Sequence, residues 1–251
     1  MVFQIKTQLT QREDKFEFEG HVRQYALGLS SYLLGLLDGV PQSDLDASKV
    51  VLKIINHRMD GDKVHYELEL DGEFSTCGAY IACIADVDIG AGESARDSCG
   101  VFVDGDGQGA RLPEECRFAE KILTGFEREK QGDFWSGMDS HMFIAMAKAE
   151  GRTFAKSVNI ANGRFSVDFR DVIGEGVEIQ SAAVFLQDPG IVRLDESVSA
   201  LGGGVWALFF NGSEVYWNDA FEGKLLVVVH TEPVVVKHRG SVNLRLSGED
   251  R

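Results

Sequence analysis

The feature that most constrains the fold is a ribbon of two strand-like segments joined by a turn. Residues 49–56 (KVVLKIIN) are β-branched and apolar, and residues 63–70 (KVHYELEL) alternate strictly between apolar and polar side chains. This period of two is typical of strands that are buried on one side and exposed to solvent on the other. Asp60-Gly61, between them, predicts a hairpin turn. A ribbon with one wet face indicates an antiparallel sheet, because parallel sheets are covered on both faces.

Similar segments recur along the chain and predict further strands over 2–9, 15–19, 79–87, 100–103, 176–186, 224–231 and 241–246. Asn162-Gly163 and Asn211-Gly212 have the composition of tight turns. They predict two more hairpins, which join 157–160 to 164–169 and 205–210 to 213–217. Short strands with turn signals between them favour antiparallel sheets in a β-sandwich or jelly-roll-like arrangement. We therefore predict a mainly β (α+β) fold.

Three segments show the helical spacing of three to four residues instead. In 21–37 the apolar side chains recur with this period, from Val22 to Leu36. After Pro113 the same spacing relates Phe118, Ile122 and Phe126, and a further piece covers 139–150. The sequence thus predicts an early helix and a helical middle segment at 113–151.

Hairpin signals resume after Gly151, so we place a domain boundary there. Residues 1–151 would form an N-terminal β-sheet domain with a packed helix and the helical segment. Residues 152–251 would form a C-terminal antiparallel β-sandwich, and a single large β domain is the alternative.

One dodecamer, residues 104–115 (DGDGQGARLPEE), has a pattern with chemical meaning. A twelve-residue calcium loop needs oxygen ligands at its first, third, fifth, seventh and twelfth positions and Gly at its sixth. The ligand positions are filled by Asp104, Asp106, Gln108, Ala110 and Glu115. The dodecamer resembles the EF-hand loop over these twelve residues only, which implies calcium. Arg111 and Pro113 depart from that pattern, so an acidic surface turn is the competing interpretation.

The aromatic segment 206–217 (WALFFNGSEVYW) is the second candidate. A hairpin here carries aromatic side chains on both faces, which is more than one core face requires. Either a neighbouring sheet of the same chain covers the second face, or a subunit or ligand does. The candidate contact residues are Trp206, Phe210, Tyr216 and Trp217.

No catalytic constellation is visible in the sequence. Five histidines stand alone, without a partner at ligand spacing, at positions 57, 65, 141, 230 and 238. Asp86 and Asp88 come closest to a carboxylate pair, at the end of a predicted strand. The glycines 202–204 open no helix and so cannot cradle a phosphate. We expect a protein that is not an enzyme and has no cofactor, unless calcium occupies 104–115.

The formal net charge of −15 argues against nucleic acid or an anionic membrane surface as a partner. The N-terminal residues lack the apolar core of a signal peptide, so we expect cytoplasmic synthesis. We expect a structural or assembly protein that self-associates, or docks onto other protein subunits, through β-sheet surfaces. Subunits of phage tails, capsids and connectors do this, and such a chain would be incorporated into a virion. The alternative is a β-sandwich module that binds a ligand, sugar or peptide, with or without calcium.

Overall fold

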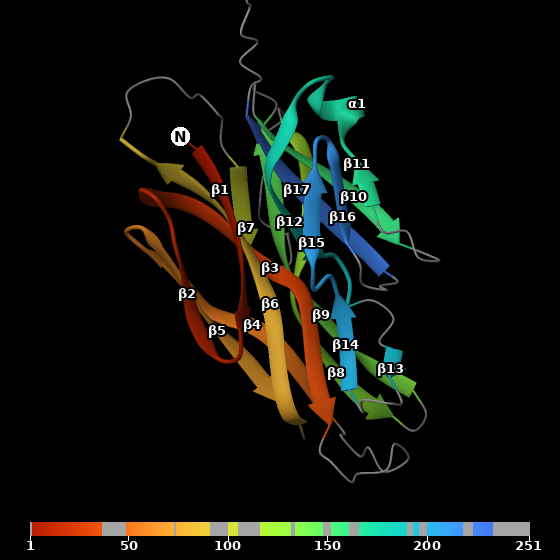
Figure 1. Ribbon diagram of the computed structural model, residues 1–251. Coiled ribbons are helices and arrows are strands. Elements are labelled where there is room, and N and C mark those ends of the chain that lie inside the picture. Colours follow the sequence, from red (N-terminus) through yellow and green to blue (C-terminus); the bar gives the residue numbers. More distant parts are fainter. Residues whose placement is uncertain are drawn as a thin grey trace, which may run out of the picture.

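The computed structural model describes residues 2–36, 49–72, 74–90, 100–104, 116–131, 134–147, 152–160, 166–189, 193–195, 200–217 and 223–232 (Figure 1). Antiparallel strands dominate these residues, and the one helix among them, α1 (Arg170–Ile173), is a single turn. The predicted mainly β fold with antiparallel sheets is confirmed.

The strands form four sheets, which we name A to D. Sheet A has the order β1 (Val2–Thr10), β6 (Phe74–Asp88), β3 (His21–Leu36), β14 (Ala200–Gly204) and β13 (Arg193–Asp195). Sheet B has the order β2 (Glu13–Glu17), β5 (Lys63–Asp71), β4 (Lys49–Asp60), β8 (Cys116–Gln131), β9 (Phe134–Ala147) and β7 (Gly100–Asp104). Sheet C has the order β10 (Thr153–Ile160), β17 (Gly223–Glu232) and β12 (Glu178–Leu186). Sheet D has the order β11 (Ser166–Asp168), β16 (Glu214–Trp217) and β15 (Leu208–Asn211).

Sheet A is the central layer because both of its faces are buried. On β6, Ile81 and Cys83 belong to one apolar cluster and Ala82 and Ile84 to the other, all with no exposed surface. The first face packs on sheet B, which curls into a half-barrel around it (Figure 1). The second face packs on sheet C and on part of β8 and β9, through Ile122, Met142, Ile144, Ala183, Phe185, Leu226 and Val228.

The ribbon predicted at 49–70 is confirmed as the β4–β5 hairpin. Asp60 pairs with Lys63, so the turn residues are Gly61 and Asp62, one position later than predicted. Val64, Tyr66 and Leu68 are buried, as their alternation indicates. The predicted strand 79–87 is also confirmed, and it lies within β6 between β1 and β3.

The helix predicted at 21–37 is wrong, because His21–Leu36 forms the long strand β3. This strand pairs with β6 along its whole length. Residues 26–32 are all buried, since neighbouring layers cover both faces of sheet A. A strand buried on both faces has a continuous apolar run, and periodicity cannot separate such a run from a buried helix.

The helical middle segment is also wrong where the structure describes it. Cys116–Gln131 and Phe134–Ala147 are the paired strands β8 and β9. The four-residue spacing of Phe118, Ile122 and Phe126 does not distinguish a helix from a strand. In β8 the bulge at Thr124 places Ile122 and Phe126 in different apolar clusters. Residues 113–115 and 148–150 lie outside the described residues.

Of the two Asn-Gly hairpins, one is confirmed and one is wrong. Asn211 pairs with Glu214, and the turn is Gly212-Ser213 with a positive φ of 58° at Gly212. Residues 157–160 and 164–169 do not form a hairpin, because β10 pairs with β17 in sheet C and β11 pairs with β16 in sheet D. Asn162-Gly163 and the strand expected at 241–246 lie outside the described residues.

Strands from both sides of residue 151 share sheet A, since Gly202 of β14 pairs with Leu33 of β3. The division into units 1–151 and 152–251 stays a prediction. Within the described part of the chain, no helix is long and apolar enough to cross a membrane.

Candidate functional site

The dodecamer 104–115 stays a prediction as a calcium site. Asp104 ends β7, opposite Met142 of β9. Asp106, Gln108, Ala110 and Glu115 lie outside the described residues. Among the described residues, no group of three or more His, Cys, Asp or Glu side chains is placed to hold a metal ion.

The β15–β16 hairpin divides its aromatic side chains between a covered face and an open one. Trp217 is 1% exposed and packs into the core together with Val215 and Leu208. On the other face Phe209 pairs with Tyr216, and their rings stack at a centroid distance of 5.6 Å. Phe210 pairs with Val215 and so lies on the covered face of the hairpin, yet it is 41% exposed. We call the three exposed aromatics of the hairpin, Phe209, Phe210 and Tyr216, the hairpin surface; they are 42%, 41% and 38% exposed.

The four predicted contact residues therefore do not act together. Phe210 and Tyr216 belong to the hairpin surface, and Trp217 belongs to the core. Trp206 lies before the hairpin, half-buried, with its ring edge-on to Tyr80 at 5.4 Å. The same chain covers one aromatic face, and the second face is open in the described structure.

The turn end of the hairpin is acidic. Asp168 of β11 pairs in register with Glu214 of β16. The carboxylate of Asp168 accepts hydrogen bonds from the backbone N–H of Arg170 at 2.8 Å and from the Ser213 hydroxyl at 3.0 Å. These donors, the backbone N–H first, lower the pKa of Asp168. The acid is thus held ionised beside the hairpin surface.

Strand β15 differs from the other edge strands of the four described sheets. Natural edge strands are protected from pairing with another chain by charged residues or by proline. The other seven edges each contain a charged residue; they are β1, β2, β7, β10, β11, β12 and β13. Strand β15 has the sequence LFFN, with neither charge nor proline.

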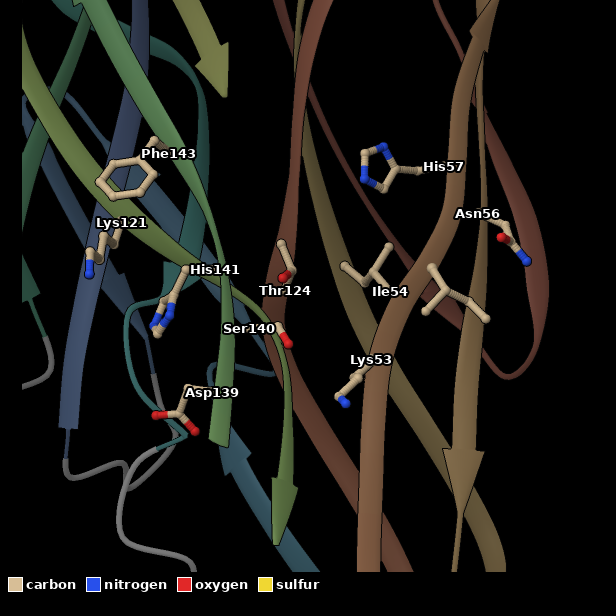
Figure 2. Close-up of a pocket in the computed structure, with 11 residues that line it drawn as sticks. Lys53, Ile54, Asn56, His57, Lys121, Thr124, Asp139, Ser140, His141 and Phe143 are labelled. Carbon is tan, nitrogen blue, oxygen red and sulfur yellow. The ribbon is translucent and has the colours of Figure 1, made fainter. Parts of the chain in front are cut away.

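A groove of roughly 640 Å³ lies between β4 and the β8–β9 pair (Figure 2). It exists because β4 and β8 pair only as far as Lys53 and Gly125. Gly125 permits the close approach at that point, since a Cβ atom there would lie 2.5 Å from the Leu52 carbonyl oxygen and from Lys53 Cα. Beyond this pair, no hydrogen-bonded ladder joins the two strands in the described structure.

Each wall of the groove contains a β-bulge. On β4, Asn56 and His57 together face one partner position on β5, and Asn56 has a positive φ of 49°. On β8, Thr124 is the extra residue between the pairs that Leu123 and Gly125 form with β9. Bulges bend a strand and redirect its side chains.

Hydrogen bonds hold both histidine rings of the groove in place. The His57 Nδ1 atom lies 2.8 Å from the Tyr25 hydroxyl, and the two rings meet edge-on. The His141 Nε2–H donates to the Gln187 carbonyl oxygen at 3.2 Å. In Figure 2, His57 lies on the β4 side and His141 on the opposite wall.

Two lysines and one carboxylate also line the groove. The Lys53 ammonium donates to Glu127 at 2.9 Å, and that of Lys121 lies over the Phe143 ring at 5.4 Å from its centroid. Hydrogen bonds from Lys53 and Lys49 lower the pKa of Glu127. The lining carboxylate, Asp139, accepts from Arg128 at 2.6 Å.

Asp86 and Asp88, the two carboxylates that most resemble a catalytic pair in the sequence, do not line this groove. Asp86 is buried within β6, between Phe3 and Gln24 of the neighbouring strands. Asp88 forms an ion pair with Arg23 at the end of the same strand.

No family model matches this sequence, and the search of curated proteins finds no match.

Sequence reasoning missed the groove. His57 and His141 are far apart in the chain, and only the register of β4, β8 and β9 brings them to one concavity. No short motif marks the two bulges. Asn56 is the one local signal, because Asn tolerates a positive φ better than most residues.

Proposed function

We propose that this chain is a structural or assembly protein that contacts a second copy of itself through the hairpin surface. The observation that carries the proposal is the exposure of Phe209 and Phe210 on the uncharged strand β15, where each is about two-fifths exposed. β12 of the same chain lies beside β15, where the Ile179 N–H donates to the Gly212 carbonyl oxygen at 2.9 Å. The exposed aromatic side chains, and not a free strand edge, therefore mark the interaction site. Such contacts build phage tails, capsids and related particles, and we propose this setting for the chain.

Self-association is favoured because one aromatic patch can serve both subunits. Two copies of the hairpin surface related by a two-fold axis meet through the same residues. Phe209 and Phe210 of one copy would then lie beside their counterparts in the other. Aromatic side chains of this kind dominate the energies of protein interfaces.

The test compares the solution mass of the full chain with that of two variants. F209S combined with Y216S removes the stacked pair from the hairpin surface, and M138S removes the most exposed methionine from β9. We expect the wild type and M138S to sediment as dimers or larger assemblies. The double variant should dissociate at concentrations about tenfold to a hundredfold higher, as for the loss of interface hot spots. A monomeric wild type, or equal effects of the two changes, would reject the proposal.

The salt dependence of association distinguishes self-association from binding to a basic protein. Two chains of net charge −15 repel each other, and salt screens this repulsion. Self-association should therefore strengthen as sodium chloride is added. An assembly that weakens with salt would point to a basic protein as the partner and contradict the proposal.

A further inference from the structure

We propose that the groove between β4 and the β8–β9 pair binds a small anionic ligand that carries a carboxylate or a phosphate group. The hairpin surface plays no part in this site. The groove's volume of roughly 640 Å³ lies within the range of about 300–1,000 Å³ that small-molecule sites occupy.

The local charge favours an anion although the chain as a whole is strongly acidic. Lys53 and Lys121 line the groove, and its lining carboxylate, Asp139, is neutralised by Arg128. Glu127, just outside, is shared between Lys53 and Lys49. Among the lining side chains two lysines face one carboxylate, and a concave surface concentrates such a field. Just outside the lining, Glu67 accepts from Asn56 and Glu120 accepts from Gln187.

Lys121 is the cation best placed to meet the ligand. Its ammonium lies over the Phe143 ring within the groove (Figure 2). In the described part of the chain, no carboxylate forms an ion pair with it. An incoming anion would therefore not have to displace a protein carboxylate from Lys121, whereas Lys53 already shares Glu127.

Neutral donors complete the lining. The hydroxyl groups of Thr124 and Ser140 can donate to an anionic oxygen. The ring of His141 is held by Gln187, and that of His57 by Tyr25. Groups that are fixed before binding lower the entropy cost of binding.

The backbone also indicates a built site. Two strands of one sheet separate at Gly125, and both carry a bulge within the next few residues, at Asn56–His57 and at Thr124. Bulges are over-represented next to binding sites, where they redirect side chains. The positive φ of Asn56 adds an unusual backbone conformation at the same place.

The test is a titration of the ¹⁵N-labelled full chain with inorganic phosphate and, separately, with succinate, followed by amide chemical shifts. Sodium chloride keeps the ionic strength constant. We expect saturable shifts that gather at 54–57, 121–124 and 139–143. Saturation by phosphate alone identifies a phosphate ligand, and saturation by succinate alone identifies a carboxylate.

Matched variants locate the binding. K121Q and K53Q should each weaken binding about tenfold, as for the loss of a charge-assisted hydrogen bond. K15Q, at an exposed position of β2 outside the groove, should bind as the wild type does. Chemical shifts that change linearly over the whole titration with both anions would overturn the proposal. So would an equal loss of affinity in K15Q and in K121Q. The double variant F209S/Y216S should titrate normally, so this result is independent of self-association.

Discussion

Replacing Gly125 with alanine should destabilise the protein, because the close approach of β4 and β8 leaves no room for a methyl group. The new Cβ atom would lie 2.5 Å from the Leu52 carbonyl oxygen and from Lys53 Cα. Ordinary van der Waals contact begins at 3.4 Å, so the two strands must separate by the difference of 0.9 Å. The obstructing atoms are backbone, and a side-chain rotation cannot relieve the contact.

The magnitude follows from what this separation breaks. A shift of about 0.9 Å takes a ladder hydrogen bond well beyond the usual distance of about 2.9 Å. Losing one or two such bonds costs about 0.5–1.5 kcal/mol each. Overpacking a core costs about 1–3 kcal/mol by direct measurement in other proteins. We therefore expect G125A to lower the free energy of unfolding by about 1–3 kcal/mol.

Gly78 of β6 provides the matched control. A Cβ atom there meets its nearest neighbour, a Leu9 methyl group, at 3.4 Å, and its φ lies outside the left-handed region. G78A should be neutral, or stabilising by about 0.4–1 kcal/mol, because alanine restricts the unfolded chain. Urea unfolding followed by tryptophan fluorescence measures both variants. If G125A were as stable as G78A, the pairing of β4 with β8 at this point would be wrong.

Three further outcomes are expected. Hydrogen bonds from Lys53 and Lys49 lower the pKa of Glu127 in the folded protein. The ionised carboxylate therefore stabilises the fold above its unfolded pKa of about 4.3, and this contribution is lost as the pH falls through the lower folded pKa. The urea midpoint of E127Q should therefore fall less steeply than that of the wild type below about pH 4.3. Y66F removes a hydroxyl that accepts from Gln8 at 2.8 Å and contacts buried Thr10, and it should lower the unfolding free energy by about 1–3 kcal/mol. W217A should cost about 3–5 kcal/mol in the same urea assay, because the indole is fully buried.

The β4–β5 hairpin shows what the sequence makes predictable. Its side chains alternate because one face is buried and the other is wet, and the turn between them is short. Strand β3 shows that the alternating pattern is lost when both faces of a strand are buried. Its apolar residues are continuous, and the covering layers come from distant parts of the chain. Local periodicity therefore indicated a helix where tertiary packing makes a strand.

The two candidate sites also differ in how far the sequence predicts them. Aromatic side chains on both faces of one hairpin were visible in a short segment, so the hairpin surface could be predicted in part. The assignment of Trp217 to the core required the neighbouring layer. The groove depends on where β4 and β8 stop pairing and on two bulges, and these are properties of register between distant segments.

Photo-crosslinking from position 209 tests the central claim, contact between two copies at the hairpin surface, most directly. A photoreactive phenylalanine analogue replaces Phe209 in one sample and Met138 in another, since both side chains are well exposed. We expect irradiation at position 209 to link two copies covalently, with the linked peptides drawn from residues 208–217 of the second copy. Position 138 should give little linkage. Unlinked monomers from position 209, or links to unrelated surfaces at both positions, would contradict the account.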